Sequence, residues 1–293
     1  MNFRERLIEK IKQKKSIVCV GLDPDTDSAE FPSFIKENYS EAKWVFSKMI
    51  IDEVEDLVAV VKPNTRFFMP NEFLQLKEIV RYAHSKDLEV IADCKQNDIG
   101  STMGLAYKYE FDGFDFDAIT VNGYLGSEGV IGDKKNPIFE KWFKKGKGIF
   151  VLVKTSNPSS SEIQNLTVGI SDPVFKDDKI YHNMAKLVEK WSSEYEYTIG
   201  AVVGATSQQI AELRDILSGV LLMPGYGARG ATGVDIKDCV KDGKYAIVNS
   251  SRAIMYAYTQ RFKGKYTKED FAKASRKEVL YMDDDINTHI KLC

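Results

Sequence analysis

The sequence is poor in the residues that build disulfide frameworks and metal centres. Its 293 residues include four cysteines and three histidines. No C-x-x-C spacing occurs among the cysteines, which are Cys19, Cys94, Cys239 and Cys293. We therefore expect reduced thiols rather than disulfides or zinc ligands. The histidines are also scattered and lie near no carboxylate cluster, so the sequence predicts no metal site; they are His84, His182 and His289.

Long apolar runs and a strong charge of one sign are missing as well. No apolar run approaches the roughly 20 residues that a membrane-spanning helix needs. The formal net charge is −2, which argues against a nucleic-acid-binding surface and a polybasic membrane patch. Residues 1–15 resemble a charged amphipathic helix and lack the apolar core of a signal peptide. Together these features predict a cytoplasmic protein with no nucleic-acid or membrane partner.

The chain does contain a series of eight short apolar segments with helix-like segments between nearly all of them. The apolar segments are 16–25, 57–64, 88–95, 116–122, 148–158, 199–204, 220–229 and 245–252. Short runs rich in branched residues are typical of buried parallel strands. Helical periodicity or composition covers 1–15, 41–57, 72–85, 100–110, 180–194, 207–217 and 266–282, and 127–145 contains a further helix. No linker interrupts this series, which predicts an α/β protein with one domain over residues 1–293, a closed (β/α)8 TIM barrel.

The most informative stretch reads LEVIADCKQND and covers residues 88–98. Side chains alternate along a strand, so Asp93 and Lys95 should share one face while Cys94 points the other way. An acid and an ammonium group then project together from the carboxyl end of a buried strand, where α/β barrels carry their chemistry. Asp98 lies past the strand and need not face the same cavity.

A second lysine favours an active site at this place. An isolated D-x-K would be explained more simply by a structural ion pair at a strand end, although a buried pair is costly unless it is well hydrogen-bonded. However, the preceding strand reads LVAVVKPN and places Lys62 at its own carboxyl edge, with Asn64 on the same face. Alternating lysines and aspartates at one barrel mouth perturb each other's pKa values, and such networks tend to mark active sites.

Polar and glycine-rich turns follow the later strands. Gly225, Gly227 and Gly230 after the seventh strand allow close backbone approach, and Arg252 after the eighth offers a bidentate fork. In α/β barrels these two loops frequently hold a phosphate group. The fifth strand ends in a run of hydroxyl and amide side chains at 155–157, which could also simply cap the next segment. Residues 159–177 show no clear period, and we interpret them as an insertion loop that could cover the site.

These residues resemble the orotidine 5'-phosphate decarboxylase family, in its longer bacterial and apicomplexan-like branch. The shared segments occur in the family's order and are G-L-D-P, K-P-N, D-x-K-x-x-D, K-T-S-N-P, P-G-x-G-A and the S-R after the eighth strand. D-x-K-x-x-D also occurs in related barrels that act on sugar phosphates, whereas K-T-S-N-P and P-G-Y-G-A narrow the match to the orotidylate enzyme. The resemblance covers nearly the whole chain.

The resemblance implies decarboxylation of orotidine 5'-phosphate to uridine 5'-phosphate and CO2, without a metal or organic cofactor, the last step of de novo UMP biosynthesis. Lys95 would be the proton donor to C6, with Asp93, Lys62 and Asp98 as the other catalytic residues. Asp98 and Thr102 would reach across from the partner subunit of a homodimer with shared active sites. The implied substrate-binding residues are Asp23, Asn64, Thr102, Ser156, Pro224, Gly225, Gly227, Arg229 and Arg252. Of these, Asp23 would bind the ribose and Ser156 the pyrimidine ring.

One position departs from the family pattern, and two other functions remain open. The family usually has Gln after P-G-x-G-A, bridging phosphate and pyrimidine, where this chain has Arg229; an arginine can donate to phosphate but cannot accept a hydrogen bond. A sugar-phosphate decarboxylase or aldolase-like barrel could use Lys95 to form a Schiff base. A lysine in that role needs a lowered pKa, whereas the flanking aspartates would raise the pKa of Lys95, so we disfavour this function. A non-catalytic nucleotide-binding barrel is disfavoured, since every catalytic position holds the expected residue type.

Overall fold

A computed structural model describes residues 1–169, 178–227, 230–241 and 245–290 of the chain. Eight parallel strands form one closed barrel in the order β1-β10-β9-β8-β5-β4-β3-β2. They are β1 (Val18–Leu22), β2 (Val60–Pro63), β3 (Glu89–Gln96), β4 (Ala118–Val121), β5 (Gly148–Lys154), β8 (Ile199–Val203), β9 (Leu221–Pro224) and β10 (Ala246–Ser250). Each lies within a segment predicted as a strand or within one residue of it, and the predicted (β/α)8 TIM barrel is confirmed.

The barrel closes where the first strand meets the last. In this seam Val18 pairs with Val248 and Val20 with Ser250, while the other edge of β1 pairs with β2. Every residue of β1 and of β10 is buried. Since branched and other apolar side chains fill these strands, the barrel interior is a packed core below the level of the pocket.

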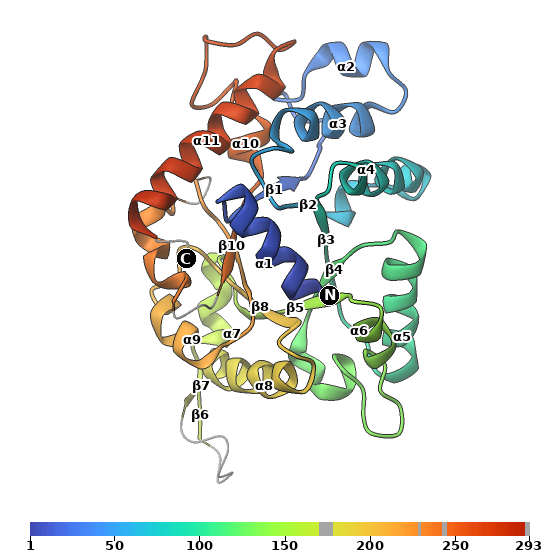
Figure 1. The fold of residues 1–293 in the computed structure, drawn as a ribbon, viewed down its shortest axis with the longest axis vertical. Helices are drawn as coiled ribbons and strands as arrows, with labels where there is room; N and C mark the ends of the chain where they lie inside the picture. The colour runs from blue at the N-terminus through green and yellow to red at the C-terminus, as the bar shows by residue number, and fades with distance from the viewer. Residues whose placement is uncertain (170–177, 228–229, 242–244, 291–293) are drawn as a thin grey trace.

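Helices surround the barrel (Figure 1). The longer ones are α1 (Phe3–Lys14), α3 (Ala42–Val54), α4 (Phe73–Ser85), α5 (Gly100–Lys108), α8 (Ile180–Glu194), α9 (Ile210–Ile216) and α11 (Phe271–His289). Short ones are α2 (Ser33–Asn38), α6 (Glu140–Lys144), α7 (Ser161–Gln164) and α10 (Arg252–Met255). Short 3-10 segments are η1 (Thr65–Phe67), η2 (Pro70–Glu72), η4 (Gly123–Leu125), η5 (Ser127–Gly129), η6 (Pro158–Ser160) and η7 (Gly233–Cys239), and η3 (Tyr109–Gly113) is a short π-helix.

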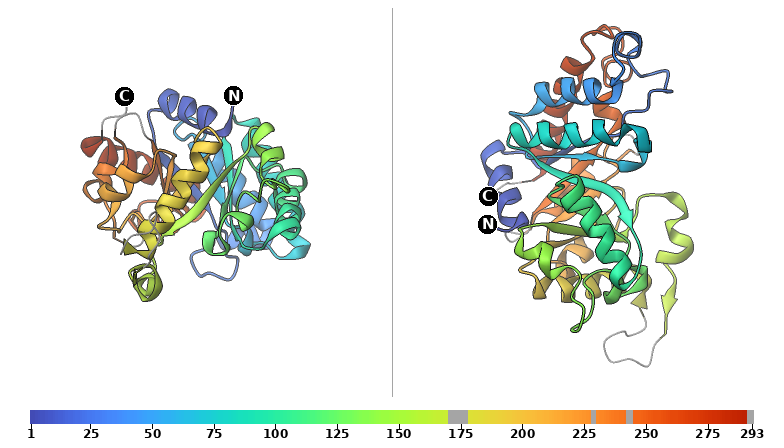
Figure 2. Two further views of the ribbon diagram at one scale, coloured as in Figure 1. Left: turned by 90° about the horizontal axis from the view of Figure 1, so that it is seen from below. Right: turned by 90° about the vertical axis from the view of Figure 1, so that its right-hand side faces the viewer.

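Helix α1 packs across the amino-terminal end of the barrel. Its Phe3 ring meets Phe150 of β5 edge-on, with centroids 5.9 Å apart, and Arg6 forms a salt bridge with Glu89 at the start of β3. The N-terminus lies on this side, opposite the segment that carries α7, β6 (Thr167–Val168) and β7 (Asp178–Lys179) (Figure 2, right). This leaves the carboxyl ends of the strands free for a site.

Several boundaries differ from the sequence prediction. The last helix begins at Phe271 rather than 266 and runs to His289 rather than 282, because neither glycine nor proline follows 282 to end it. The predicted helix in 127–145 is confined to α6, after two 3-10 turns. Helix α2 and the two-stranded β6–β7 sheet were not predicted. Among the described residues, no helix is both long and apolar enough to cross a membrane.

Candidate active site

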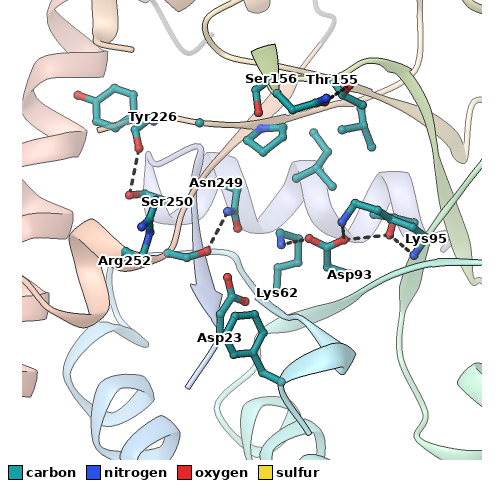
Figure 3. A pocket seen from close by; sticks show the side chains of 18 of the residues that line it. Asp23, Lys62, Asp93, Lys95, Thr155, Ser156, Tyr226, Asn249, Ser250 and Arg252 are labelled. Atoms are coloured by element: carbon teal, nitrogen blue, oxygen red, sulfur yellow. Dashed lines mark hydrogen bonds and ion pairs between the residues drawn. The ribbon is translucent and has the colours of Figure 1, made fainter. Parts of the chain in front are cut away.

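A pocket opens at the carboxyl ends of the barrel strands, where TIM barrels carry their active sites. Its volume is about 930 Å³, and residues in or just after all eight barrel strands line it. A cavity of this size fits a ligand such as a mononucleotide. Two groups of side chains face each other across it: Lys62, Asp93 and Lys95 on one side, and Tyr226, Ser250 and Arg252 on the other (Figure 3).

The first group is a line of alternating charges. Lys62, which is 3% exposed at the end of β2, donates from Nζ to Asp93 Oδ2 at 2.7 Å. The other oxygen of Asp93 accepts a hydrogen bond from Lys95 Nζ. Lys95 is half exposed and reaches into the open cavity. One carboxylate therefore holds two ammonium groups in place, and only the outer one is presented to solvent or ligand.

Burial and charge act in opposite directions on this line. Burial alone would raise the pKa of Asp93, but the two lysines outweigh it and hold that pKa well below its usual range. Burial likewise disfavours the charged form of Lys62, but the neighbouring Asp93 and Asp23 raise its pKa above the ordinary value. Asp93 and Lys62 are thus both charged at neutral pH.

Asp23, which follows β1, carries an unused acceptor. Burial raises the pKa of its carboxyl group, against the attraction of Lys62 and a hydrogen bond from Ser251. Its Oδ1 atom is buried and has no hydrogen-bond partner among the described residues. A buried acceptor at a pocket wall is costly unless a donor satisfies it, so this atom can accept a hydrogen bond from a ligand.

The turn after β9 and the start of α10 form the opposite wall. Gly225 and Gly227 adopt positive φ values of 111° and 69°, which only glycine accepts readily. Pro224, Gly225, Tyr226 and Arg252 line the pocket, whereas Gly227 is not among the lining residues. Asp285 of α11 fixes this turn from outside, accepting from the Tyr226 hydroxyl and from the Gly233 N–H at 2.6 Å. Arg229, predicted to contact the substrate, lies outside the described residues.

Polar groups after β5 form a third wall. Ser156 and Thr155 both line the pocket (Figure 3). Ser156 packs closely against Gly204, because a Cβ atom added to Gly204 would lie only 2.9 Å from Ser156 Cβ. Gln164 of α7 accepts from the Thr155 N–H at 2.9 Å and donates to its hydroxyl at 2.7 Å. Within the described part of the predicted loop 159–177, Gln164 thus lines the pocket and ties this segment to the end of β5.

Besides Gly227, three further predicted site residues are not among those that line the pocket of their own chain. The Asn64 side chain caps η1 by accepting from Arg66 N–H at 3.1 Å, and its backbone N–H donates to Asp23. The Asp98 side chain accepts from Ile99 N–H at 2.8 Å, and Thr102 is exposed on α5. Asp98 and Thr102 both lie in the segment that leads away from the strand end.

Sequence reasoning missed several polar residues of the pocket lining, among them Thr120, Gln164 and Asn249. Thr120 is the one polar side chain within the buried strand β4 (Ala118–Val121), and this signal could have identified it. The other two lie in segments that were interpreted only as a loop and a strand. Among the described residues, no group of three or more His, Cys, Asp or Glu side chains could hold a metal ion.

Comparison with known proteins gives one consistent result. Residues 16–265 match the model of the Orotidine 5'-phosphate decarboxylase / HUMPS family. The orotidine 5'-phosphate decarboxylase of Caldicellulosiruptor saccharolyticus is 36% identical over 99% of both chains, and that of Clostridium perfringens is 37% identical over 98% of both. The structure of Leishmania donovani OMP decarboxylase superposes with a TM-score of 0.72 at 26% identity, covering 97% of this chain and 99% of that one.

Proposed function

Because the chain belongs to the orotidine 5'-phosphate decarboxylase family, we propose a role for each group of residues in its pocket. The reaction removes CO2 from C6 of orotidine 5'-phosphate and yields uridine 5'-phosphate, in UMP biosynthesis. The observation that carries our assignment of roles is the buried line Lys62–Asp93–Lys95, whose outer ammonium group faces the cavity.

Lys95 stabilises and then protonates the developing carbanion. When the C6–carboxylate bond breaks, its electron pair stays on C6 in the plane of the ring, where the π system cannot delocalise it. A fixed ammonium group beside C6 lowers the energy of this charge. A proton then moves from Lys95 Nζ to C6, which gives uridine 5'-phosphate and a neutral amine that solvent reprotonates.

Asp93 and Lys62 prepare Lys95 for this step. The ionised Asp93 holds the Lys95 ammonium group in place through their hydrogen bond, and it lies where it would crowd the substrate carboxylate. Lys62 keeps Asp93 ionised despite its burial and is placed to donate to the ribose. Since the ammonium is set before substrate arrives, little reorganisation accompanies the chemical step.

The other walls bind the parts of the substrate that do not react. Arg252 and the turn at Pro224, Gly225 and Gly227 hold the phosphate group. The unpaired Oδ1 atom of Asp23 accepts from a ribose hydroxyl, with Asn64 supporting it through the backbone. Ser156 faces the pyrimidine ring, and Arg229 contributes to the phosphate side. Binding energy from these remote groups orients C6 against Lys95.

The active site is shared between two copies of the chain. Asp98 and Thr102 would enter the partner's pocket, since neither lines its own. Three exposed apolar side chains follow β3 and β4 near this segment, Ile99 (50% exposed), Tyr124 (79%) and Leu125 (40%). Apolar side chains gathered at a surface favour a protein interface. Our proposal takes residues 1–293 as one barrel domain in a cytoplasmic homodimer; the buried free thiols Cys19, Cys94 and Cys239 support the location.

The role of Lys95 is tested by Lys95→Ala. Removing both the cation and the proton donor should lower kcat for orotidine 5'-phosphate at least about 10⁴-fold. Affinity for uridine 5'-phosphate should change little, because the phosphate wall is intact. Lys144→Ala, on the exposed helix α6, is the matched control and should retain full turnover. Near-native kcat in Lys95→Ala would exclude it as proton donor, and borohydride trapping of a substrate adduct on the wild type would favour the Schiff-base chemistry instead.

A further inference from the structure

The strand that carries Asp93 and Lys95 does not run regularly to its end. In the β3–β4 ladder Ala92 pairs with Ile119, and the next pair is Gln96 with Val121. Residues 93–95 of β3 therefore lie opposite a single residue of β4, Thr120. Such a bulge bends the strand and redirects side chains, and bulges are frequent beside active sites.

Lys95 is the most strained residue of this bulge. Its φ angle is +48°, in the left-handed region that few residues other than glycine adopt. A conformation of this kind persists only where surrounding contacts impose it. The contacts that impose it here should also determine where the Lys95 ammonium group points.

The Thr120 hydroxyl supplies those contacts. Its Oγ1 atom accepts from the Cys94 N–H at 3.1 Å and from the Lys95 N–H at 3.0 Å. Two accepted hydrogen bonds leave the hydroxyl proton for donation, and the nearer of its two acceptors is Asp93 Oδ1 at 3.3 Å, with Ala92 O at 3.5 Å. That same oxygen of Asp93 accepts from Lys95 Nζ. One hydroxyl thus contacts the backbone of Lys95 and the carboxylate that holds its ammonium group.

The Thr120 hydroxyl lies on a strand that is otherwise apolar. Thr120 is 2% exposed, and its neighbours in β4 are apolar. A valine at this place would have nearly the same shape, and a hydroxyl in a buried strand is unfavourable unless it is used. Its use in the described residues is to satisfy two N–H groups that the bulge has removed from the strand ladder.

We propose that Thr120 is a positioning residue for the decarboxylation, which sets Lys95 and Asp93 relative to C6 of the substrate. This inference rests on the roles proposed above for Lys95 and Asp93. Without the hydroxyl, Lys95 relaxes toward ordinary strand geometry and its ammonium group moves away from the reacting carbon. A displacement of about 1 Å at a reacting group can reduce the rate on the order of 10²-fold. The phosphate and ribose contacts lie on other strands and stay in place.

The test compares Thr120→Val, which keeps the shape, with Thr120→Ser, which keeps the hydroxyl. Thr120→Val should lower kcat about 10²-fold, while Kd for uridine 5'-phosphate changes less than about threefold. Thr120→Ser should restore kcat to within about fivefold of the wild type, which a role in packing alone would not produce. Thr198→Val is the control, because Thr198 is also buried but its hydroxyl donates to Tyr195 O in the turn before β8; it should leave kcat unchanged.

Each result has a distinct meaning. A wild type without turnover of orotidine 5'-phosphate would overturn the proposed function itself. An active wild type whose kcat survives Thr120→Val within about threefold would overturn the positioning role alone. If Thr120→Val does not fold, the pair Thr120→Ser and Thr120→Ala, which differ by one oxygen atom, makes the same comparison. Equal kcat values in that pair would refute the inference.

Discussion

Two inactive variants of this protein should regain activity when their subunits are mixed. The first variant is Lys95→Ala, which removes the cation inside the pocket. The second is Asp98→Ala, which removes a carboxylate that lies outside the pocket of its own chain. If each site combines Lys95 of one chain with Asp98 of the other, a mixed dimer has one site with both substitutions and one site with neither.

The size of the recovery follows from two-fold symmetry. Random pairing of equal amounts makes about half of the dimers mixed, and each mixed dimer has one intact site of two, so activity should return to about a quarter of wild type. If Asp98 instead served its own chain, each site in the mixture would lack one residue and activity would stay at the level of the parents.

The assay follows loss of orotidine 5'-phosphate after the two variants are exchanged in mild denaturant and returned to buffer. Native mass spectrometry of a mass-tagged subunit measures the fraction of mixed dimers. The control mixes Lys62→Ala with Lys95→Ala, two residues that contact Asp93 in the same chain; this pair should show no recovery. Mixed dimers of Lys95→Ala and Asp98→Ala that stay inactive, or an active wild-type monomer, would refute the shared site.

Two further changes test the pocket walls. Arg252→Ala should weaken binding of uridine 5'-phosphate about 10- to 150-fold, the loss expected of a hydrogen bond between charged groups, and leave uridine binding unchanged by calorimetry; equal weakening of both ligands would remove Arg252 from the phosphate site. Lys62 and Lys95 hold the pKa of Asp93 below its usual range despite burial. The ionised carboxylate therefore stabilises the folded protein fully above the pKa of an aspartate in the unfolded chain, about 3.9, and this contribution to the free energy of unfolding is lost as the pH falls further. Asp93→Asn should therefore lower the free energy of unfolding by about 3 kcal/mol near neutral pH, and urea titrations should show this difference shrinking below about pH 4; a constant difference down to about pH 2 would contradict the assignment.

Much of the fold was visible in the sequence because buried parallel strands leave a strong local signal. The segment that contains β3 (Glu89–Gln96) could be identified from its branched apolar residues, and the charges after them marked its carboxyl end. The start of α11 was less visible, since the residues before Phe271 are polar and include no proline. Helix boundaries of this kind depend on which tertiary contacts a segment finds, and these contacts are not local.

The sequence identified many of the residues of the site, but it did not predict the backbone geometry that brings them together. Strand alternation placed Asp93 and Lys95 together, and the two side chains do meet, but they do so through a bulge in which Lys95 has a positive φ. A bulge depends on a residue of the neighbouring strand, here Thr120. The alternation of side chains along β3 therefore could not predict it. The K-P-N segment likewise suggested a pocket role for the Asn64 side chain, whereas capping of η1 uses it in the structure.

The β1–β10 seam imposes an order on folding. Val20 pairs with Ser250, so the barrel cannot close until nearly the whole chain is available, and contacts between such distant residues form slowly. Lys62 and Asp93 come from the neighbouring strands β2 and β3, which pair directly, whereas Asp23 and Arg252 lie on the two sides of the seam. In a nascent or refolding chain, the line Lys62–Asp93–Lys95 can thus form before the residues that bind the ribose and the phosphate have come together. Return of catalytic activity should therefore lag behind the return of helical circular dichroism and report the moment at which the first strand meets the last.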